Sequence, residues 1–335
     1  MIKKILIANR GEIAVRIVRA CAEMGITSVA VYTDPDRYAL HVKRADESYN
    51  VGSDPLAGYL NPRQLVNLAV ETGCDALHPG YGFLSENAEL AKICAERGIK
   101  FIGPAAEVIT RMGDKTEARR SMIAAGVPVT PGTEGNLADL DEALREAERV
   151  GYPVMLKATS GGGGRGIRRC NNREELESAY PRVISEATKA FGSAEVFLEK
   201  CIVNPKHIEA QILADSFGNT VHLFERDCSI QRRNQKLIEI APSPQLTPEQ
   251  RAYIGDLAVK AAQAVGYENA GTVEFLLADD EVYFMEMNTR VQVEHTITEQ
   301  ITGVDIVREQ IRIASGLPLS IKQEDVQHQG FAIQF

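Results

Sequence analysis

The sequence has no CxxC pair, no long apolar run and no excess of basic residues, and each absence narrows its function. The six cysteines lie far apart, so we expect neither a zinc site nor a disulfide framework, and we infer a reducing cytoplasm. The apolar runs are short and interrupted, which argues against a membrane span. The N-terminal stretch MIKKILIANRGE is followed by no small-residue cleavage site, so we expect no signal peptide.

The charge balance is acidic, with a formal net charge of −9. Nucleic-acid binding requires a basic face, so neither nucleic acid nor a membrane is expected as a partner. The acidic net charge does not exclude a local basic pocket that binds a small anion. The 335 residues are 44% hydrophobic, which is enough for two or three domains with buried cores.

Residues 1 to about 104 alternate between strand and helix patterns. Short apolar strands are expected at 3–9, 28–33, 76–81 and 100–104, with helical periodicity at 12–25, 62–73 and 86–98. This alternation predicts an α/β domain with a doubly wound, mostly parallel sheet. The first strand-to-helix turn, ANRGEIA, has one glycine and lacks the dinucleotide fingerprint. A nicotinamide dehydrogenase is therefore disfavoured.

After residue 104 the pattern changes to α+β. Helices are expected at 105–125, 138–150 and 248–265, and a turn followed by a helix at 171–180. Between them lie strand-like segments at 153–158, 166–170, 194–202, 207–215 and 219–229, and a hairpin at 272–288 with its turn at ADDE. Short turns between strands predict antiparallel pairing.

The stretch MLKATSGGGGRGIRRC contains a run of glycines that is costly in backbone entropy. Gly161, Gly163 and Gly166 match GxGxxG, but the loop joins two strands and not a strand and a helix, so it is no Rossmann fingerprint. A P-loop is excluded too, because no Gly-Lys-Ser or Gly-Lys-Thr occurs. We interpret the run as the tip of a hairpin whose amides cover phosphates. The alternative is a mobile surface turn.

The hairpin at 272–288 carries acidic residues at strand spacing. Alternation places Phe284, Glu286 and Asn288 on one face, and the ADDE turn brings Glu274 opposite Glu286. Two close carboxylates repel unless a cation lies between them. Oxygen ligands without His or Cys suit Mg²⁺. The alternative is a solvated hairpin face.

Cationic residues cluster in ERDCSIQRRNQKLIE and in TRVQVEH. Arg232, Arg233 and Lys236 lie close together in the first segment, and Arg290 lies in the second. Such a patch beside a metal site suits an anionic substrate, although each group could also form an ordinary surface ion pair. From spacing alone, the single histidines in these regions are expected to be structural.

Seven segments together resemble one family, biotin carboxylase, an ATP-grasp enzyme: ANRGEIAVRIVRA, HPGYGFLSEN, FIGP, MGDKTEAR, KATSGGGGRGIR, ERDCSIQRRNQK and EMNTRVQVEH. The segments occur in order along the whole chain. Within this family, the segment RRNQKLIEIAPSPQL most resembles the separate biotin carboxylase subunit of a two-subunit pyruvate carboxylase.

The resemblance implies a reaction and a domain organisation. Bicarbonate would be activated by ATP through carboxyphosphate, and CO₂ would pass to N1 of biotin on a carrier protein. The implied domains are a Rossmann-like one at 1–113, an ATP-grasp domain at 114–317 with a lid at about 131–203, and the start of a C-terminal domain at 318–335. The implied cofactors are ATP, Mg²⁺ or Mn²⁺, and biotin as the substrate on its carrier.

The resemblance also implies roles for individual residues. The metal ligands would be Glu274, Glu286 and Asn288. Bicarbonate would be bound by Lys236, Arg290, Gln292 and the Val293 amide, and Glu294 would be the general base, so that the catalytic residues are Arg290, Glu294 and Lys236. The nucleotide would be bound by Lys115, Lys157, Gly163, Gly164, Arg165, Gly166, Glu199, Lys200, His207, Gln231 and Asn234.

Two departures from the family pattern modify these expectations. Asn234 stands where many biotin carboxylases have His, so altered contacts to ATP with retained activity are expected. The sequence ends at GFAIQF, where the family continues with an Arg and a region that completes the biotin pocket. We therefore expect nucleotide binding with much reduced or absent biotin carboxylation.

The implied partners are a biotin carboxyl carrier or carboxyltransferase subunit, together with a second copy of the chain in a homodimer. Two alternatives stay open. The first is another ATP-grasp ligase, such as a carbamoyl-phosphate synthase-type enzyme, which would share the lysines, the lid and the metal ligands. The second is a nucleotide-binding module without catalysis. The final carboxyl acceptor would be chosen by the partner.

Overall fold

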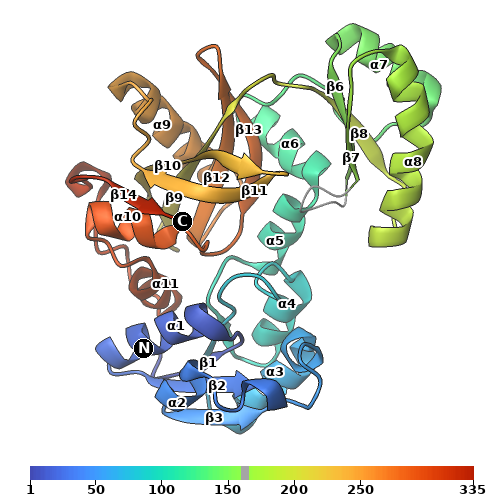
Figure 1. Ribbon diagram of the computed structural model, residues 1–335. Helices are drawn as coiled ribbons and strands as arrows, with labels where there is room; N and C mark the ends of the chain where they lie inside the picture. The colour runs from blue at the N-terminus through green and yellow to red at the C-terminus, as the bar shows by residue number, and fades with distance from the viewer. Residues whose placement is uncertain (160–165) are drawn as a thin grey trace.

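The computed structural model describes residues 1–159 and 166–335 (Figure 1). Three sheets organise the chain: a parallel sheet near the N-terminus, a large antiparallel sheet and a small antiparallel sheet that stands apart from both. This arrangement confirms the predicted combination of an α/β domain followed by an α+β region. Within the described residues, no helix has the length and apolar character needed to cross a membrane.

The N-terminal sheet has the order β3-β2-β1-β4-β5, and its four strand pairs are parallel. Its strands are β1 Lys4–Ile7, β2 Thr27–Tyr32, β3 Glu47–Asn50, β4 Ala76–His78 and β5 Lys100–Phe101. The connecting helices are α1 Gly11–Glu23, η1 Asp34–Asp36, α2 Leu40–Arg44, η2 Ala57–Leu60, α3 Pro62–Glu71 and α4 Ala88–Glu96. The sequence patterns missed β3, because the edge segment ESYN has no apolar alternation.

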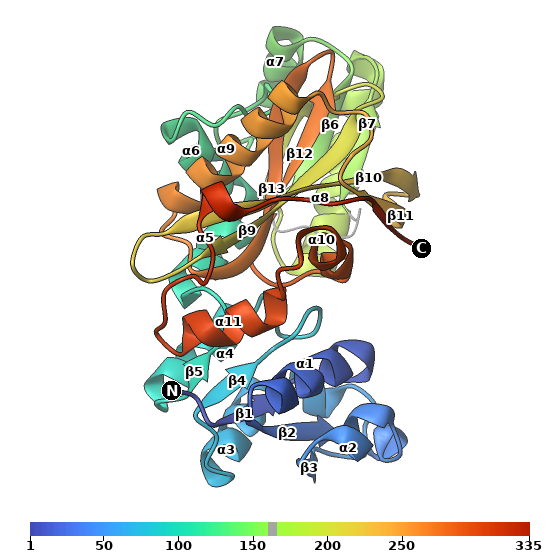
Figure 2. The ribbon, with the colours of Figure 1, turned by 90° about the vertical axis from the view of Figure 1, so that its left-hand side faces the viewer.

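Helices cover both faces of this sheet, as the doubly wound prediction requires. Ile5 and Ile7 of β1 pack in one cluster with Ile17 of α1, whereas Leu6 packs on the opposite face with Leu65 of α3. The cluster around Ile5 also contains residues of α11 (Ile306–Ala314) from the C-terminal part of the chain. In Figure 2, α11 lies beside α1 and joins the N-terminal domain to the rest.

The large sheet has the order β13-β12-β9-β10-β11-β14. One of its faces packs on a helical layer through the apolar side chains of Val273, Phe275, Met122 and Ile254. The strands are β9 Lys206–Ala214, β10 Thr220–Arg232, β11 Gln235–Ala241, β12 Asn269–Ala278, β13 Glu281–Asn288 and β14 Ala332–Gln334. The helices around it are α5 Ala106–Gly113, α6 Lys115–Ala124, α9 Pro248–Ala264, α10 His295–Thr302 and η3 Gln323–Asp325.

The helix expected at 105–125 is interrupted at Asp114. This residue ends α5 and begins α6, where its side chain accepts hydrogen bonds from the backbone amides of Thr116 and Glu117, at 2.9 and 3.0 Å. An aspartate in this position satisfies free amides of the first helical turn. The cap therefore makes Lys115 the first residue of α6.

The small sheet has the order β7-β6-β8 and carries α7 Leu140–Val150 and α8 Arg173–Phe191. Its strands are β6 Val154–Ala158, β7 Ile167–Cys170 and β8 Val196–Lys200. The β6–β7 pair is antiparallel, which confirms the predicted hairpin. Two isolated bridges, Val129 with Phe284 and Gly132 with Glu199, tie one connecting segment to both antiparallel sheets. The predicted domain boundaries stay predictions.

A β-bulge in β13 corrects one prediction about the acidic hairpin. The paired residues change from Phe275 with Phe284 to Glu274 with Glu286, so β13 contains one extra residue between these pairs. Phe284 and Met287 both pack into the apolar core. Phe284 and Glu286 therefore lie on opposite faces, and the expectation that they share a face was wrong.

Candidate active site

Three glutamates form a row across adjacent strands of the large sheet. Glu274 on β12 is paired with Glu286 on β13 on one side and with Glu209 on β9 on the other. The predicted pair of Glu274 and Glu286 is thus confirmed. Glu209 was missed, although the alternation in HIEAQ, with Ile208 and Ala210 in the core, predicts that His207, Glu209 and Gln211 share the opposite face.

Burial and neighbouring charges shift the pKa values of Glu274 and Glu286 in opposite directions. Burial raises the pKa of Glu286, and the negative charge of Glu274 raises it further. Burial also acts to raise the pKa of Glu274, but hydrogen bonding to His207 and the charge of Lys236 outweigh it, so that the pKa is lowered. The two neighbouring acids therefore differ in their preference for a proton, and a cation near Glu286 would stabilise its charged form.

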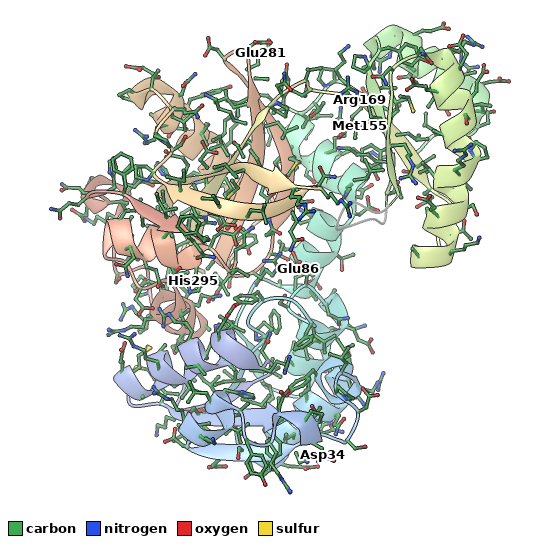
Figure 3. The ribbon with its side chains drawn as sticks, in the orientation of Figure 1. Asp34, Glu86, Met155, Arg169, Glu281 and His295 are labelled. Atoms are coloured by element: carbon green, nitrogen blue, oxygen red, sulfur yellow. The ribbon has the colours of Figure 1, made fainter. Side chains whose placement is uncertain are left out.

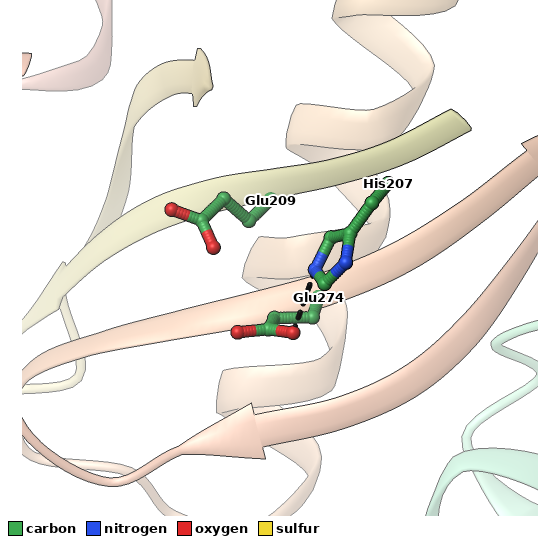
Figure 4. Close-up of side chains that lie close together, drawn as sticks. All are labelled: His207, Glu209 and Glu274. Carbon is green, nitrogen blue, oxygen red and sulfur yellow. Dashed lines mark ion pairs between the residues drawn. The ribbon is translucent and has the colours of Figure 1, made fainter. Parts of the chain in front are cut away.

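His207 lies against the central glutamate, as Figure 4 shows. Its Nε2 is 2.7 Å from Glu274 Oε2, and its Nδ1 is 2.8 Å from the side-chain amide of Gln231. Burial lowers the pKa of His207, but Glu274 raises it more, and the net shift is upward. His207 and Gln231, expected near the nucleotide, are therefore next to each other and to an expected metal ligand.

Lys236 on β11 connects three acidic groups. Its Nζ donates hydrogen bonds to Glu209 Oε2 at 2.5 Å, to Glu274 Oε1 at 3.0 Å and to Glu294 Oε1 at 2.8 Å. Burial alone would lower the pKa of Lys236, but these carboxylates raise it above its ordinary value. Lys236 is therefore a permanent cation within the candidate site.

The end of β13 and the segment after it border the site and supply hydrogen-bond donors to it. The side-chain amides of Asn288 and Gln292 both donate to Glu274 Oε1, at 2.7 and 3.0 Å. Arg290 donates to Asn288 Oδ1 and to Glu86 Oε2, each at 3.0 Å. The segment thus directs amide and guanidinium N–H groups toward carboxylates, which is also the pattern that would bind an anion.

Glu86 is a site neighbour that the sequence analysis missed. It lies in the loop after β4 of the N-terminal domain, 204 residues away from Arg290 along the chain. Figure 3 shows Glu86 below the large sheet, between the two domains. No local sequence pattern predicts this contact, because it forms only where α11 packs the large sheet against the N-terminal domain.

The expected nucleotide residues meet where the small sheet faces α6. Lys157 on β6 forms an ion pair with Glu199 on β8, and Arg119 of α6 lies 3.3 Å from the same glutamate. Burial lowers the pKa of Lys115, and Glu286 opposes this effect. Lys115 therefore lies between the carboxylate row and the small sheet. Arg119 was missed by the sequence analysis.

Five further expected residues have different outcomes. The Lys200 side chain turns to the backbone, with its Nζ 2.7 Å from the Gly151 carbonyl oxygen and 3.0 Å from that of Tyr152. Gly166 has a φ of +68°, and its carbonyl accepts from the Ala158 amide. The expected contacts of Gly163, Gly164 and Arg165 lie outside the described residues.

Asn234 lies at the tip of the β10–β11 hairpin. Arg233 and Asn234 have φ values of 55° and 62°, and both residues of a type I′ turn require positive φ. Asparagine adopts this conformation at low cost. The residue that departs from the family pattern therefore suits its turn, and it is exposed. Among the described members of the expected set, Val293 is also exposed, at 45%.

Comparison with known proteins agrees with this arrangement. Residues 1–109 match the family described as biotin carboxylase, N-terminal domain, and residues 114–322 match the family described as carbamoyl-phosphate synthase L chain, ATP binding domain. The 2-oxoglutarate carboxylase small subunit of Hydrogenobacter thermophilus is 58% identical over all of this chain and 71% of its own length. Biotin carboxylase 1 of Bacillus subtilis is 55% identical over all of this chain and 75% of its own.

Solved structures give the same result in three dimensions. A biotin carboxylase domain dimer of the H. thermophilus 2-oxoglutarate carboxylase, in complex with MgADP, ADP and bicarbonate, matches with a TM-score of 0.96 and 58% identity, over 99% of this chain and 74% of that one. A biotin carboxylase from Campylobacter jejuni matches with a TM-score of 0.97 and 48% identity, over 99% and 75%.

Proposed function

The chain belongs to the biotin carboxylase family, and from this premise we propose that it uses ATP and bicarbonate to carboxylate biotin on a carrier protein, through carboxyphosphate. The observation that supports this proposal is the convergence of Lys236, Gln292, Arg290 and Glu294 beside the row of three glutamates. Cations and N–H donors suit an anionic substrate, and a carboxylate beside them suits a base.

Bicarbonate would bind where these donors meet. Lys236, Arg290, Gln292 and the Val293 amide would hold its oxygens, and Glu294 would accept its proton. A bicarbonate oxygen would then attack the γ-phosphorus of ATP, ADP would leave, and the carboxyphosphate formed would release CO₂ and phosphate. N1 of biotin would lose its proton to the phosphate released, and CO₂ would join that nitrogen. Arg290 would stabilise negative charge on the ureido oxygen during this transfer.

The described residues fit a magnesium ion. Glu274 is 3% exposed and Asn288 is 7% exposed, and Glu274 faces Glu286 across two strands. Oxygen ligands from two carboxylates and an amide suit Mg²⁺ or Mn²⁺, and a cation would relieve the repulsion that raises the pKa of Glu286. When bound, the ion would neutralise charge on the nucleotide phosphates.

Lys115 and Lys157 would contact the nucleotide phosphates. The H. thermophilus structure, in a protein 58% identical to this chain, is a complex with MgADP and bicarbonate, which supports the same ligands here. Lys157 would exchange its partner Glu199 for a phosphate on binding. Glu199 would then be free to contact the adenine edge, as the family resemblance implies.

We also propose that the biotin is carried on a separate carrier or carboxyltransferase subunit, and that the final acceptor is a 2-oxo acid such as pyruvate. One support is the similarity to the 2-oxoglutarate carboxylase of H. thermophilus. Another is a pyruvate carboxylase subunit of Methanothermobacter thermautotrophicus, which is 53% identical over all of this chain and 68% of its own length. The H. thermophilus domain is a dimer, which supports a homodimer here.

The test is ADP release from Mg-ATP by the purified chain, with and without bicarbonate and free biotin. From the family membership we expect release that requires bicarbonate and is stimulated by biotin, whereas bicarbonate-dependent release without a biotin response would agree with the reduced biotin carboxylation expected from the sequence alone. Binding of Mg-ATP without any response to bicarbonate or biotin would instead favour a nucleotide-binding module. Equal activity with ammonia in place of biotin would favour a carbamoyl-phosphate synthase-type ligase.

A further inference from the structure

Arg226 on β10 is a fully buried cation beneath the candidate site, and the sequence analysis did not identify it. Its exposed fraction is 0%. A guanidinium has five N–H groups, and here each has an acceptor. The acceptors are Glu209 Oε1 at 2.5 Å, Gln211 Oε1 at 2.8 Å, Thr298 Oγ1 at 2.9 Å, Thr272 Oγ1 at 3.1 Å and Gln292 Oε1 at 2.8 Å.

This network determines the orientation of the Gln292 side chain. Arginine can only donate, so the atom of Gln292 that faces Arg226 must be its oxygen. The amide nitrogen of Gln292 consequently points the other way, and it donates to Glu274 Oε1 at 3.0 Å. With Arg226 in place, Gln292 presents a donor to the site and cannot present an acceptor.

The same guanidinium also positions Lys236 through Glu209. One oxygen of Glu209 accepts from Arg226, and the other accepts from Lys236 Nζ. Glu209 is 0% exposed, so its two oxygens have these two cations in place of water. The location of the Lys236 ammonium therefore depends on how Arg226 holds the carboxylate.

We propose that Arg226 is a positioning residue for bicarbonate recognition, because it fixes the donor face of Gln292 and, through Glu209, the ammonium of Lys236. Arg226 does not touch the substrate. This inference rests on the proposed function, in which Gln292 and Lys236 bind bicarbonate. It gives a side chain that is shielded from water a role in selecting a small anion with acceptor oxygens.

The main test compares Arg226→Lys with Thr298→Val. Lysine keeps the charge but has three donors, so it cannot hold Gln292 and Glu209 together with the other acceptors. Valine removes one acceptor of Arg226 that has no link to Gln292 or Glu209, and so it controls for a general loss of stability. Thermal unfolding of both variants is measured first, and kinetics follow at a temperature where both are folded.

We expect Arg226→Lys to raise the KM for bicarbonate by about tenfold or more, which is the usual size of an effect on the partners of ligating groups. The KM for ATP is expected to change less than about threefold, and Thr298→Val is expected to leave both values near those of the parent chain. Equal changes in both KM values, or equal effects of the two variants, would overturn the proposal.

A second variant, Gln292→Glu, tests the link directly. Glutamate keeps an oxygen for Arg226 but replaces the N–H group that faces Glu274. It should weaken bicarbonate binding while Arg226 is intact. Arg226→Lys should add less in this background than in the parent chain, because only its effect through Glu209 and Lys236 is left. If the effects of the two substitutions multiply, Arg226 does not act through Gln292 and the proposal fails.

Binding can be measured without turnover. The line width of ¹³C-bicarbonate in the presence of Mg-ADP reports its dissociation constant for the parent chain and for each variant. A parent chain that binds Mg-ADP and no bicarbonate would contradict the proposed function itself. Equal bicarbonate affinities of the parent chain and of Arg226→Lys would overturn only the role of Arg226.

Discussion

Lys236 Nζ lies 2.8 Å from Glu294 Oε1, so the cation and the base proposed for bicarbonate activation form an ion pair with each other. Lys236 is 21% exposed and Glu294 is 7% exposed at their side chains, so this pair is largely withdrawn from water. A bicarbonate that enters the site must share Lys236 with Glu294.

Replacing this base gives the first prediction. Glu294→Gln removes the proton acceptor and keeps the size of the side chain, so bicarbonate-dependent ADP release should fall by about 10²- to 10⁴-fold. Mg-ADP affinity, measured by calorimetry, should change little. A variant that releases ADP at the rate of the parent chain would exclude Glu294 as the base.

The second prediction concerns the metal ligands. Glu286→Gln should abolish the stabilisation that Mg²⁺ gives to the ADP-bound chain, which is about 2.7 kcal/mol when the ligand is at 100 times its Kd. Without metal, the same variant should be more stable than the parent chain, because it removes a buried charge beside Glu274.

The matched control is Glu281→Gln. Glu281 lies on the same strand, β13, but it is exposed, so its removal should leave the Mg²⁺ response of the unfolding temperature unchanged. Thermal unfolding with ADP, over a series of Mg²⁺ concentrations, measures both effects. Equal responses in the two variants would rule out Glu286 as a ligand.

The third prediction is a loss of stability in mild acid. Burial lowers the pKa of His78 to about 3 and that of His295 to about 4, from an ordinary value of 6.5. The unfolded chain therefore binds protons that the folded chain does not, so stability is complete above pH 6.5 and falls below it. Each histidine contributes a slope of about 1.4 kcal/mol per pH unit between pH 6 and 5.

Urea unfolding at pH 7.5, 6.0 and 5.0 measures this slope, and His78→Gln should reduce it by about half of the contribution of the pair. The comparison at pH 7.5 isolates the packing effect of the substitution. His207 has a raised pKa, so its contribution is complete below pH 6.5 and is lost above that value; it therefore stays constant between pH 6.0 and 5.0, where the slope is taken. An unchanged slope in His78→Gln would contradict the assignment.

The fourth prediction uses two glycines of the segment that precedes α7. A Cβ on Gly132 would lie 2.3 Å from the Leu198 carbonyl oxygen and 2.9 Å from the Glu199 Cα, whereas a Cβ on Gly135 would meet only the end of the Arg120 side chain, at 3.0 Å. Gly132→Ala should therefore cost about 1–3 kcal/mol of unfolding free energy. It should also weaken nucleotide binding, because it displaces Glu199.

Gly135→Ala is the control for this pair. Arg120 is a flexible surface side chain, so the change in unfolding free energy should stay within about 0.5 kcal/mol. Urea unfolding and ADP titration of both variants give the comparison. Similar losses in the two variants would show that the bridge between Gly132 and Glu199 has no special importance.

The sequence predicts those parts of the fold that local patterns determine. The buried strands of the N-terminal sheet have continuous apolar runs, and the pairing of Glu274 with Glu286 follows from the short turn between their strands. Asp279 and Asp280 in that turn have φ values of 49° and 66°, as a two-residue hairpin loop requires. Family resemblance supplied most of the remaining site residues.

The parts that were missed depend on contacts between distant segments. The bulge in β13 reverses the face of Phe284 because β13 must reach both the apolar core and the carboxylate row, and alternation alone cannot show this. Glu86 reaches Arg290 only after two domains have docked. Arg226 lies between two acidic residues of β10, Glu225 and Asp227, as a surface arginine would, and its five acceptors come from four other segments of the chain.

The two bridges of the segment before α7 have a consequence for the rate of nucleotide exchange. Val129 is fixed to the large sheet and Gly132 to the small sheet, and the Pro131 carbonyl also accepts from the Lys200 amide of β8, so Thr130 alone separates the two attachments in this segment. The second connection between these sheets is the short segment 201–205, between β8 and β9. A rotation of the small sheet about the two connections would change the distance between the ammonium groups of Lys157, on that sheet, and Lys115, on α6. Rotations of this kind take microseconds to milliseconds. We expect this rotation of the small sheet to limit the rate of ADP release.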